Sequence, residues 1–222
     1  MRHITLIAIG LLFTISIFAQ SEQYVAAMES AISRMDTTEA IEDWKTVVNT
    51  FERIGQAEEE EWLPQYYQAY SHIRMAITHM QQQNMVECEI NIEASQKALD
   101  KAKKLAGKNS EIVTLQGYIY QGRIWSNPQQ NGPVYSPKAS QAIQQAMQME
   151  PGNPRPHHLM GQNLYFTPAQ WGGGAKVALP HLKKADEAFE NFEPKSSIHP
   201  SWGKVFNDWL LEQATAKLEE DK

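Results

Sequence analysis

Apolar side chains recur three and four positions apart along almost the whole chain, and this spacing restricts the fold more than any other feature. One clear run is Leu63, Tyr66, Tyr70, Ile73, Ile77 and Met80. An α-helix turns once every 3.6 residues, so such a run lies on one helix face. No stretch shows a sustained alternation of period two, which is the pattern of a half-buried strand. The sequence therefore predicts an all-α fold with no sheet.

Turn signals divide this pattern into separate helices. The expected helices cover residues 22–35, 41–54, 63–80, 85–106, 112–125, 139–147, 159–164, 178–192 and 202–217. Gly107 and Ser110 provide a helix stop followed by a helix start. The segment Pro128–Pro137 contains three prolines and a glycine, and is expected to be a loop. The run Trp171–Gly174 is expected to be a tight or flexible loop between two helices.

The first 19 residues have the layout of a secretory signal peptide. Arg2 and His3 precede an apolar run of about 15 residues, and Ala19 stands where a signal peptidase would cut. Cleavage is expected after Ala19 or Gln20. A retained N-terminal anchor is the alternative, although the run is shorter than the roughly 20 residues that a membrane span needs. No cysteine lies nearby for lipid attachment, so we predict a periplasmic or secreted protein without a later membrane span.

A repeated pattern of small and bulky residues links the expected helices in pairs. Ala139, Ile143 and Ala146 have the same spacing as Ala178, Leu182 and Ala185. Gly117 and Gly161 fall in the helices that precede these two. Small side chains at such places let the two backbones of a helix pair approach closely. Glycine in the first helix and alanine in the second therefore predict two closely packed pairs.

The chain resembles the tetratricopeptide repeat family in this pattern, most clearly over residues 95–190. The resemblance implies about four antiparallel helix pairs with an extra C-terminal helix, forming one domain over residues 20–222. Together with the signal peptide and the glycine-rich loop, it is similar to exported repeat proteins of Bacteroidetes-type bacteria. It resembles more weakly the periplasmic repeat subunit of TRAP-type transporters, which carry organic acids. An irregular helical bundle with the same pairing is the alternative.

Motifs for catalysis are missing from the sequence. The one cysteine, Cys88, lies on an apolar helix face, which favours a buried thiol. The adjacent His157 and His158 point about 100° apart on a helix and do not suit one metal ion. The three glycines after Trp171 lack the lysine of a phosphate-binding loop. We therefore predict no catalytic residue, no metal and no cofactor, although a hydrolase without a visible motif remains a third possibility.

The remaining prediction is a binding surface on the concave side of the array. The net charge of −6 argues against nucleic acid as a partner. In the related repeat proteins, set positions of each first helix line the groove. The resemblance places six groove residues there: Tyr118, Gln121, Arg155, His158, Gln162 and Tyr165. Arg155 is expected to be exposed and free to bind a carboxylate, either of a peptide or of a small acid.

Two functions compete for this surface. The first is a non-catalytic scaffold that binds a protein or peptide in the groove. The alternative is a periplasmic subunit that binds a small organic ligand, such as an organic acid, for a transporter. The shape of the groove discriminates between them. An aromatic-lined cavity of a few hundred Å³ favours the ligand, and an open concave face favours the protein partner.

Overall fold

The computed structural model describes residues 22–220 and confirms the all-α fold. A first helix covers residues 22–36. The others are α2 Ile41–Ala57, α3 Leu63–Gln81, α4 Met85–Ala106, α5 Ser110–Ser126, α6 Pro128–Met149, α7 Pro154–Phe166, α8 Ala175–Asn191 and α9 Lys204–Glu220, with a 3₁₀ turn at Ala169–Trp171. No strand occurs in this part of the chain. The predicted signal peptide, residues 1–19, lies outside the described residues.

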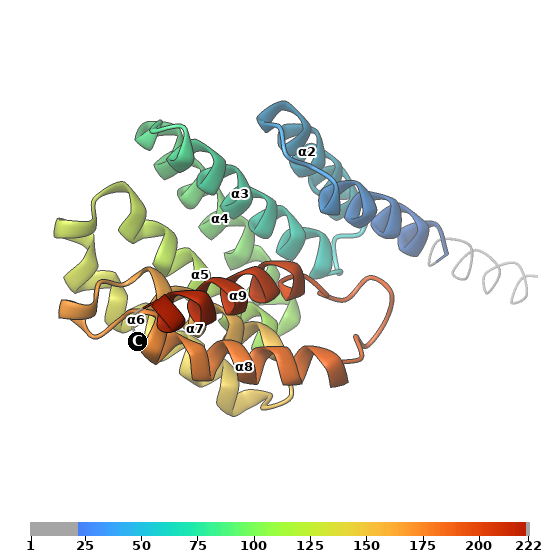
Figure 1. Ribbon diagram of the computed structural model, residues 1–222. Helices are drawn as coiled ribbons and strands as arrows, with labels where there is room; N and C mark the ends of the chain where they lie inside the picture. Colours follow the sequence, from blue (N-terminus) through green and yellow to red (C-terminus); the bar gives the residue numbers. More distant parts are fainter. Residues whose placement is uncertain (1–21, 221–222) are drawn as a thin grey trace, which may run out of the picture.

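Neighbouring helices pack as hairpins that stand side by side (Figure 1). The closest packing lies within the hairpins α3–α4, α5–α6 and α7–α8, and α9 then packs on α8 and α7. This is the predicted arrangement of helix pairs with an extra C-terminal helix. The first helices of successive hairpins also touch, since α3 contacts α5 and α5 contacts α7. One side of the array is therefore made by α3, α5 and α7.

Asparagine side chains start four consecutive helices. Asn84, Asn109, Asn127 and Asn153 cap α4, α5, α6 and α7, each accepting a backbone N–H of the first turn. Such a cap satisfies one of the donors that have no partner inside the helix. The sequence pointed to Ser110 as the start of α5, but Asn109 is the cap and Ser110 is already helical.

The prediction of a loop over Pro128–Pro137 is wrong, because this segment forms the first half of α6. Asn127 caps the helix and Pro128 occupies its first turn, where a missing N–H has no cost. Pro133 and Pro137 lie inside the helix, and both are exposed. The carbonyl groups left without a helical partner can therefore bond to water. Tyr135 also stacks on Tyr120 of α5, with ring centroids 6.1 Å apart, and holds this half against the array.

The expected close approaches are confirmed in two hairpins. A Cβ atom added to Gly117 would lie 2.7 Å from Cγ1 of Ile143 in α6. One added to Gly161 would lie 2.5 Å from Cδ2 of Leu182 in α8. Real Cβ atoms do not come this close to other heavy atoms. The absence of a side chain at these two positions thus lets α5 lie on α6 and α7 lie on α8.

The loop between α7 and α8 is tight, which is one of the two forms that the sequence predicted for Trp171–Gly174. Gly172 and Gly174 have φ angles of 82° and 101°, in the region where side chains are disfavoured. A Cβ atom on the intervening Gly173 would collide with the carbonyl oxygen of Thr167. Three consecutive glycines are therefore required by the turn itself.

The C-terminal part of the chain returns to the beginning of the array. After α8 ends at Asn191, a connector over residues 192–203 leads to α9, which Figure 1 shows in red across the middle of the molecule. Ile198 and Trp202 of the connector join the main core, which also contains Tyr66 and Tyr70 of α3. Leu210 and Ala214 of α9 belong to a smaller core with α8. The connector thus covers the side made by α3, α5 and α7.

Candidate functional site

A groove of about 740 Å³ lies where the C-terminal segment meets the first half of the chain. We call it the aromatic groove. Its principal lining residues are Met35, Trp44, Tyr70, Arg74, Tyr118, His158, Trp202, Phe206 and Trp209. They come from the first helix, α2, α3, α5, α7, the end of the connector and the start of α9. The volume lies within the range of about 300–1,000 Å³ that small-molecule sites occupy.

Three nearly parallel rings form one part of the groove. Trp202 stacks on both Tyr70 and Tyr118, with centroid distances of 4.7 Å and 6.2 Å and interplanar angles of 23° and 21°. All three side chains are almost completely buried. Offset stacking of this kind holds aromatic rings in fixed planes. The groove therefore has a rigid aromatic wall, of which only a small part is accessible.

A second aromatic pair stands at the rim on α9. Phe206 and Trp209 stack with centroids 5.4 Å apart and planes 7° apart. Phe206 is 39% exposed and Trp209 is 44% exposed, and the neighbouring Val205 is 85% exposed. Contiguous exposed apolar groups beside a cavity mark binding sites more often than they mark ordinary surface. A flat apolar ligand would cover them.

Arg74 is the cation available to a ligand in this groove. It is exposed, its guanidinium lies 5.5 Å from the ring centre of Trp44, and it donates a hydrogen bond of 3.3 Å to the Tyr70 hydroxyl. The other lining cation, Lys204, is held by Asp186, Glu190 and Asp208 at 3.0–3.2 Å. Arg74 has no carboxylate within 4 Å among the described residues. An anionic group on a ligand would therefore meet Arg74.

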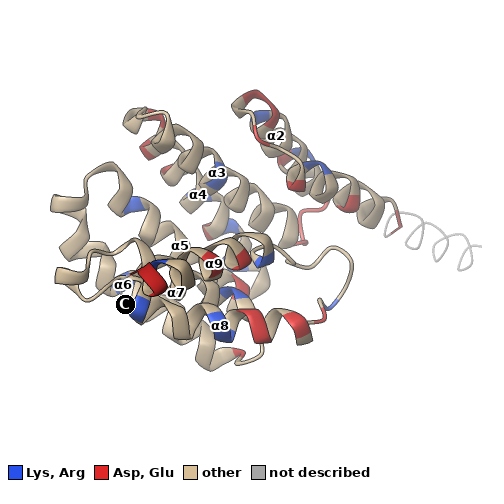
Figure 2. Ribbon diagram, viewed as in Figure 1, with Lys and Arg blue, Asp and Glu red and all other residues tan. Residues whose placement is uncertain are grey.

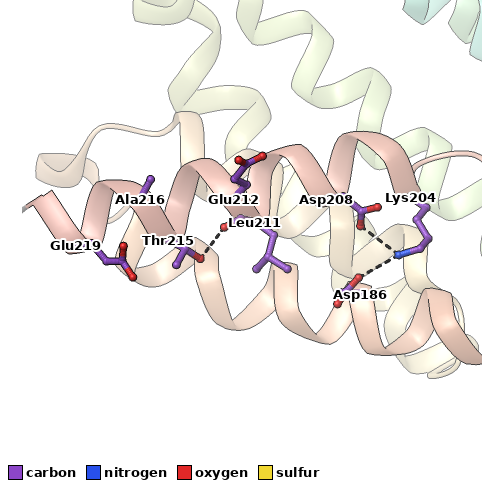
Figure 3. A pocket seen from close by; sticks show the side chains of 8 residues that line it. All are labelled: Asp186, Lys204, Asp208, Leu211, Glu212, Thr215, Ala216 and Glu219. Atoms are coloured by element: carbon purple, nitrogen blue, oxygen red, sulfur yellow. Dashed lines mark hydrogen bonds and ion pairs between the residues drawn. The ribbon is translucent and has the colours of Figure 1, made fainter.

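A second depression lies between α8 and α9, is shallow and is lined mainly by charged and polar residues together with Leu211 and Ala216 (Figure 3). Figure 3 shows Lys204 between Asp186 and Asp208, with Glu212 and Glu219 further along α9. The ammonium group neutralises the nearest carboxylates. No group of three or more histidine, cysteine or acidic side chains in residues 22–220 is arranged to hold a metal ion. Figure 2 shows acidic and basic segments interspersed on α8 and α9, with no continuous basic stripe in this view.

His158 is a buried neutral histidine in the groove lining. Its Nδ1 lies 3.3 Å from Oδ1 of Asn207, whose amide nitrogen donates to the carbonyl oxygen of Leu182. The amide orientation makes Nδ1 the protonated nitrogen of the ring. Burial lowers the pKa of His158 to about 4, and it lowers the pKa of the adjacent His157 to about 4 as well. Both rings are therefore uncharged at neutral pH.

We expect the fold to lose stability as the pH falls from about 7 toward 4. The unfolded chain would bind protons at these histidines near their ordinary pKa of 6.5, whereas the folded chain would not. Below pH 6.5 the unfolded state thus binds more protons, and stability decreases with falling pH. Urea unfolding at several pH values measures this decrease. His158→Gln should give a shallower decrease, and a variant whose pH profile parallels the wild type would contradict the assignment.

The structure corrects the expected position of Arg155. It was expected to be exposed, but none of its surface is accessible. Its Nε donates to Oε2 of Glu111 at 2.9 Å, and its guanidinium lies 4.5 Å from the ring centre of Phe192. Arg155 does point to the side that Tyr118 occupies, since both contact Trp202. The connector covers this side, so Arg155 is enclosed and cannot meet a ligand carboxylate.

The other five predicted residues divide between the groove and the interior. Tyr118 and His158 line the aromatic groove. Gln121 is buried and donates to the carbonyl oxygen of Leu159, and Gln162 is buried as well. Tyr165 is half-buried and packs edge-to-face on Phe166 near the glycine-rich loop. The structure thus brings only two of the six predicted residues into one site.

Sequence reasoning missed Trp44, Tyr70, Arg74 and Trp202. The repeat pattern had no assigned register before residue 95, so no groove positions were named in α2 and α3. A signal for the C-terminal contribution was present. Trp202, Phe206 and Trp209 give the last expected helix more large aromatic residues than a solvated helix needs.

Comparison with known proteins finds one informative relative. No protein-family model matches the chain, and no curated protein matches it. A solved structure, described as the HusA haemophore from Porphyromonas gingivalis, is similar to it with a TM-score of 0.77 and 30% sequence identity. The match covers 87% of this chain and 94% of that one. No helix within residues 22–220 is long and apolar enough to cross a membrane.

Proposed function

This chain belongs to the family of the HusA haemophore, and we propose from that premise that it is an exported protein that binds haem or a related porphyrin. The observation that carries the proposal is the aromatic groove. Its rigid stack of Tyr70, Trp202 and Tyr118 and its exposed rim on α9 suit a large flat apolar ring. The protein is proposed to be a carrier without catalytic activity.

The groove also suits the two carboxylate groups that haem carries. Arg74 is exposed, lies against Trp44 and forms no ion pair within 4 Å among residues 22–220, and the Asp36 carboxylate of the same groove interacts with it from further away. A guanidinium group binds carboxylates through short charge-assisted hydrogen bonds. With the apolar ring in the groove, the carboxylates at its edge would lie near Arg74.

A protein or peptide partner has less support from the shape of the groove. The concave side of the array is covered by the connector, so an extended open face does not remain. What remains is an aromatic cavity of the size that small ligands occupy. The alternative prediction from the sequence, a small organic ligand, therefore has the stronger basis, with a porphyrin in place of a simple organic acid.

Titration of the ligand-free protein with haemin tests the proposal. We expect saturable binding of one haemin per chain, seen as a shifted Soret band. Tryptophan fluorescence should be quenched, because three of the chain's 6 tryptophans line the groove. Absence of saturable binding would reject the porphyrin, and saturable binding of a peptide library in its place would favour the scaffold.

We expect Arg74→Ala to weaken haemin binding about tenfold. A charge-assisted hydrogen bond contributes about 1.5–3 kcal/mol, and the exposure of Arg74 places its effect at the lower end. Arg53→Ala is the matched control, because Arg53 is an exposed arginine on α2 outside the groove. The dimethyl ester of haemin has no free carboxylate, so its affinity should not respond to Arg74→Ala. An equal loss for haemin and its ester would contradict the role of Arg74.

A further inference from the structure

Trp202 depends on side chains outside the groove for its orientation. It lies near the end of the connector, next to Gly203, whose φ of 112° only glycine adopts easily. The plane of the indole is set by the side chains that contact it. The indole stacks on Tyr70 at 4.7 Å and is only 8% exposed.

The edge of the indole is held by a hydrogen bond to Tyr66. The Nε1–H group of Trp202 donates to the Tyr66 hydroxyl at 2.9 Å, and that hydroxyl donates to Oε2 of Glu111 at 3.3 Å. Burial and then the Glu111 carboxylate raise the pKa of Tyr66, so the hydroxyl keeps its proton. A protonated hydroxyl whose hydrogen points to Glu111 offers its lone pair to the indole.

The carboxylate at the end of this chain is itself fixed. Glu111 accepts hydrogen bonds from Nε of Arg155 and from the side-chain amide of Asn153, at 2.9 Å and 2.6 Å. The Arg155 guanidinium also lies 5.9 Å from the ring centre of Trp202. The network therefore holds the indole by a hydrogen bond at its N–H edge, and the Arg155 guanidinium lies near the face of the ring.

Tyr66, Glu111 and Arg155 do not line the aromatic groove. Tyr66 is completely buried and can affect a ligand only through its neighbours. Resting on the proposed porphyrin function, we propose that Tyr66 is a positioning residue that fixes the plane of Trp202 and, through its stacking on Tyr70 and Tyr118, the aromatic wall that the ligand would meet. A ring that is already ordered loses little freedom when the ligand binds.

The direct test is Tyr66→Phe, which removes the hydroxyl and keeps the ring. We expect haemin to bind three- to tenfold more weakly, which corresponds to ordering one side chain during binding. Tyr67→Phe is the matched control, because Tyr67 is the next residue, is 1% exposed and has a hydroxyl with no hydrogen-bond partner among residues 22–220. The control should bind haemin as the wild type does. Unchanged affinity in Tyr66→Phe would overturn the proposal.

A double-mutant cycle separates positioning from general loosening of the fold. Phenylalanine at position 202 has no N–H group, so Tyr66→Phe should have no further effect on affinity in a Trp202→Phe background. An equal loss in both backgrounds would mean that Tyr66 does not act through Trp202, and would overturn the proposal.

Hydrogen exchange in the ligand-free protein tests the positioning role of Tyr66 independently. The indole N–H signal of Trp202, identified by its loss in Trp202→Phe, should be protected from hydrogen exchange in the wild type and exchange faster in Tyr66→Phe. Equal exchange rates would overturn the proposal even if haemin binds. If the wild type does not bind haemin at all, the proposed function fails, and a positioning role for that ligand fails with it.

Discussion

Arg155→Met is expected to lower the free energy of unfolding by about 3–5 kcal/mol. Methionine fills much of the same space but leaves the Glu111 carboxylate buried without its cation. Removing one partner of a buried ion pair has a cost of this size, because the remaining charge lacks compensation. Urea unfolding monitored by circular dichroism measures the loss.

Arg123→Met provides the control for this prediction. Arg123 forms the same kind of pair with Glu93, but the Glu93 side chain is 51% exposed. Exposed pairs contribute less than about 1 kcal/mol, so the loss should be small. Glu111→Gln combined with Arg155→Met should recover part of the loss, since no charge then remains buried. Equal losses of unfolding free energy for Arg155→Met and Arg123→Met would show that burial does not increase the contribution of the Glu111–Arg155 pair to stability.

Gly161→Leu is expected to destabilise the fold by about 1–3 kcal/mol. Even a Cβ atom there would lie 2.5 Å from Cδ2 and 3.2 Å from the backbone nitrogen of Leu182. The side chain of Leu182 could turn away, but its backbone could move only if α7 and α8 separated. Overpacking of a filled interface has a cost of this size.

Gly132→Ala is the matched control, since Gly132 lies within α6 with open space around it. Alanine in a helix interior is favoured over glycine by about 0.5–1 kcal/mol, so this variant should be more stable than the wild type. Thermal unfolding of both variants gives the comparison. An increased midpoint for Gly161→Leu would contradict the close approach of α7 and α8.

The helices could be predicted because their pattern is local. A run such as Leu63, Tyr66 and Tyr70 defines a helix face without knowledge of the partner that it meets. The small residues at Gly117 and Gly161 correctly identified two hairpins. The segment after Pro128 was misread because prolines usually interrupt helices, whereas here Asn127 and Pro128 together form a helix start.

The site could be predicted only in part, since the repeat pattern does not show what covers a helix face. The register correctly placed Tyr118 and Arg155 on the same side. It could not show that Trp202 would lie on that side and bury Arg155. In the predicted repeat register, Glu111 and Arg155 have opposite charges at the same position of successive units, and this pattern was a sign of an internal ion pair.

The contact between Trp202 and Tyr66 joins residues 136 positions apart, which bears on the order of folding. The contacts within a hairpin such as α3–α4 are local and can form while the rest of the chain is still being synthesised. The aromatic groove does not exist until the connector arrives. A chain stopped before residue 202 would lack the aromatic groove and, under the proposed function, a place for the ligand. The proposed binding would thus be acquired only after the connector and the start of α9 have packed on the array.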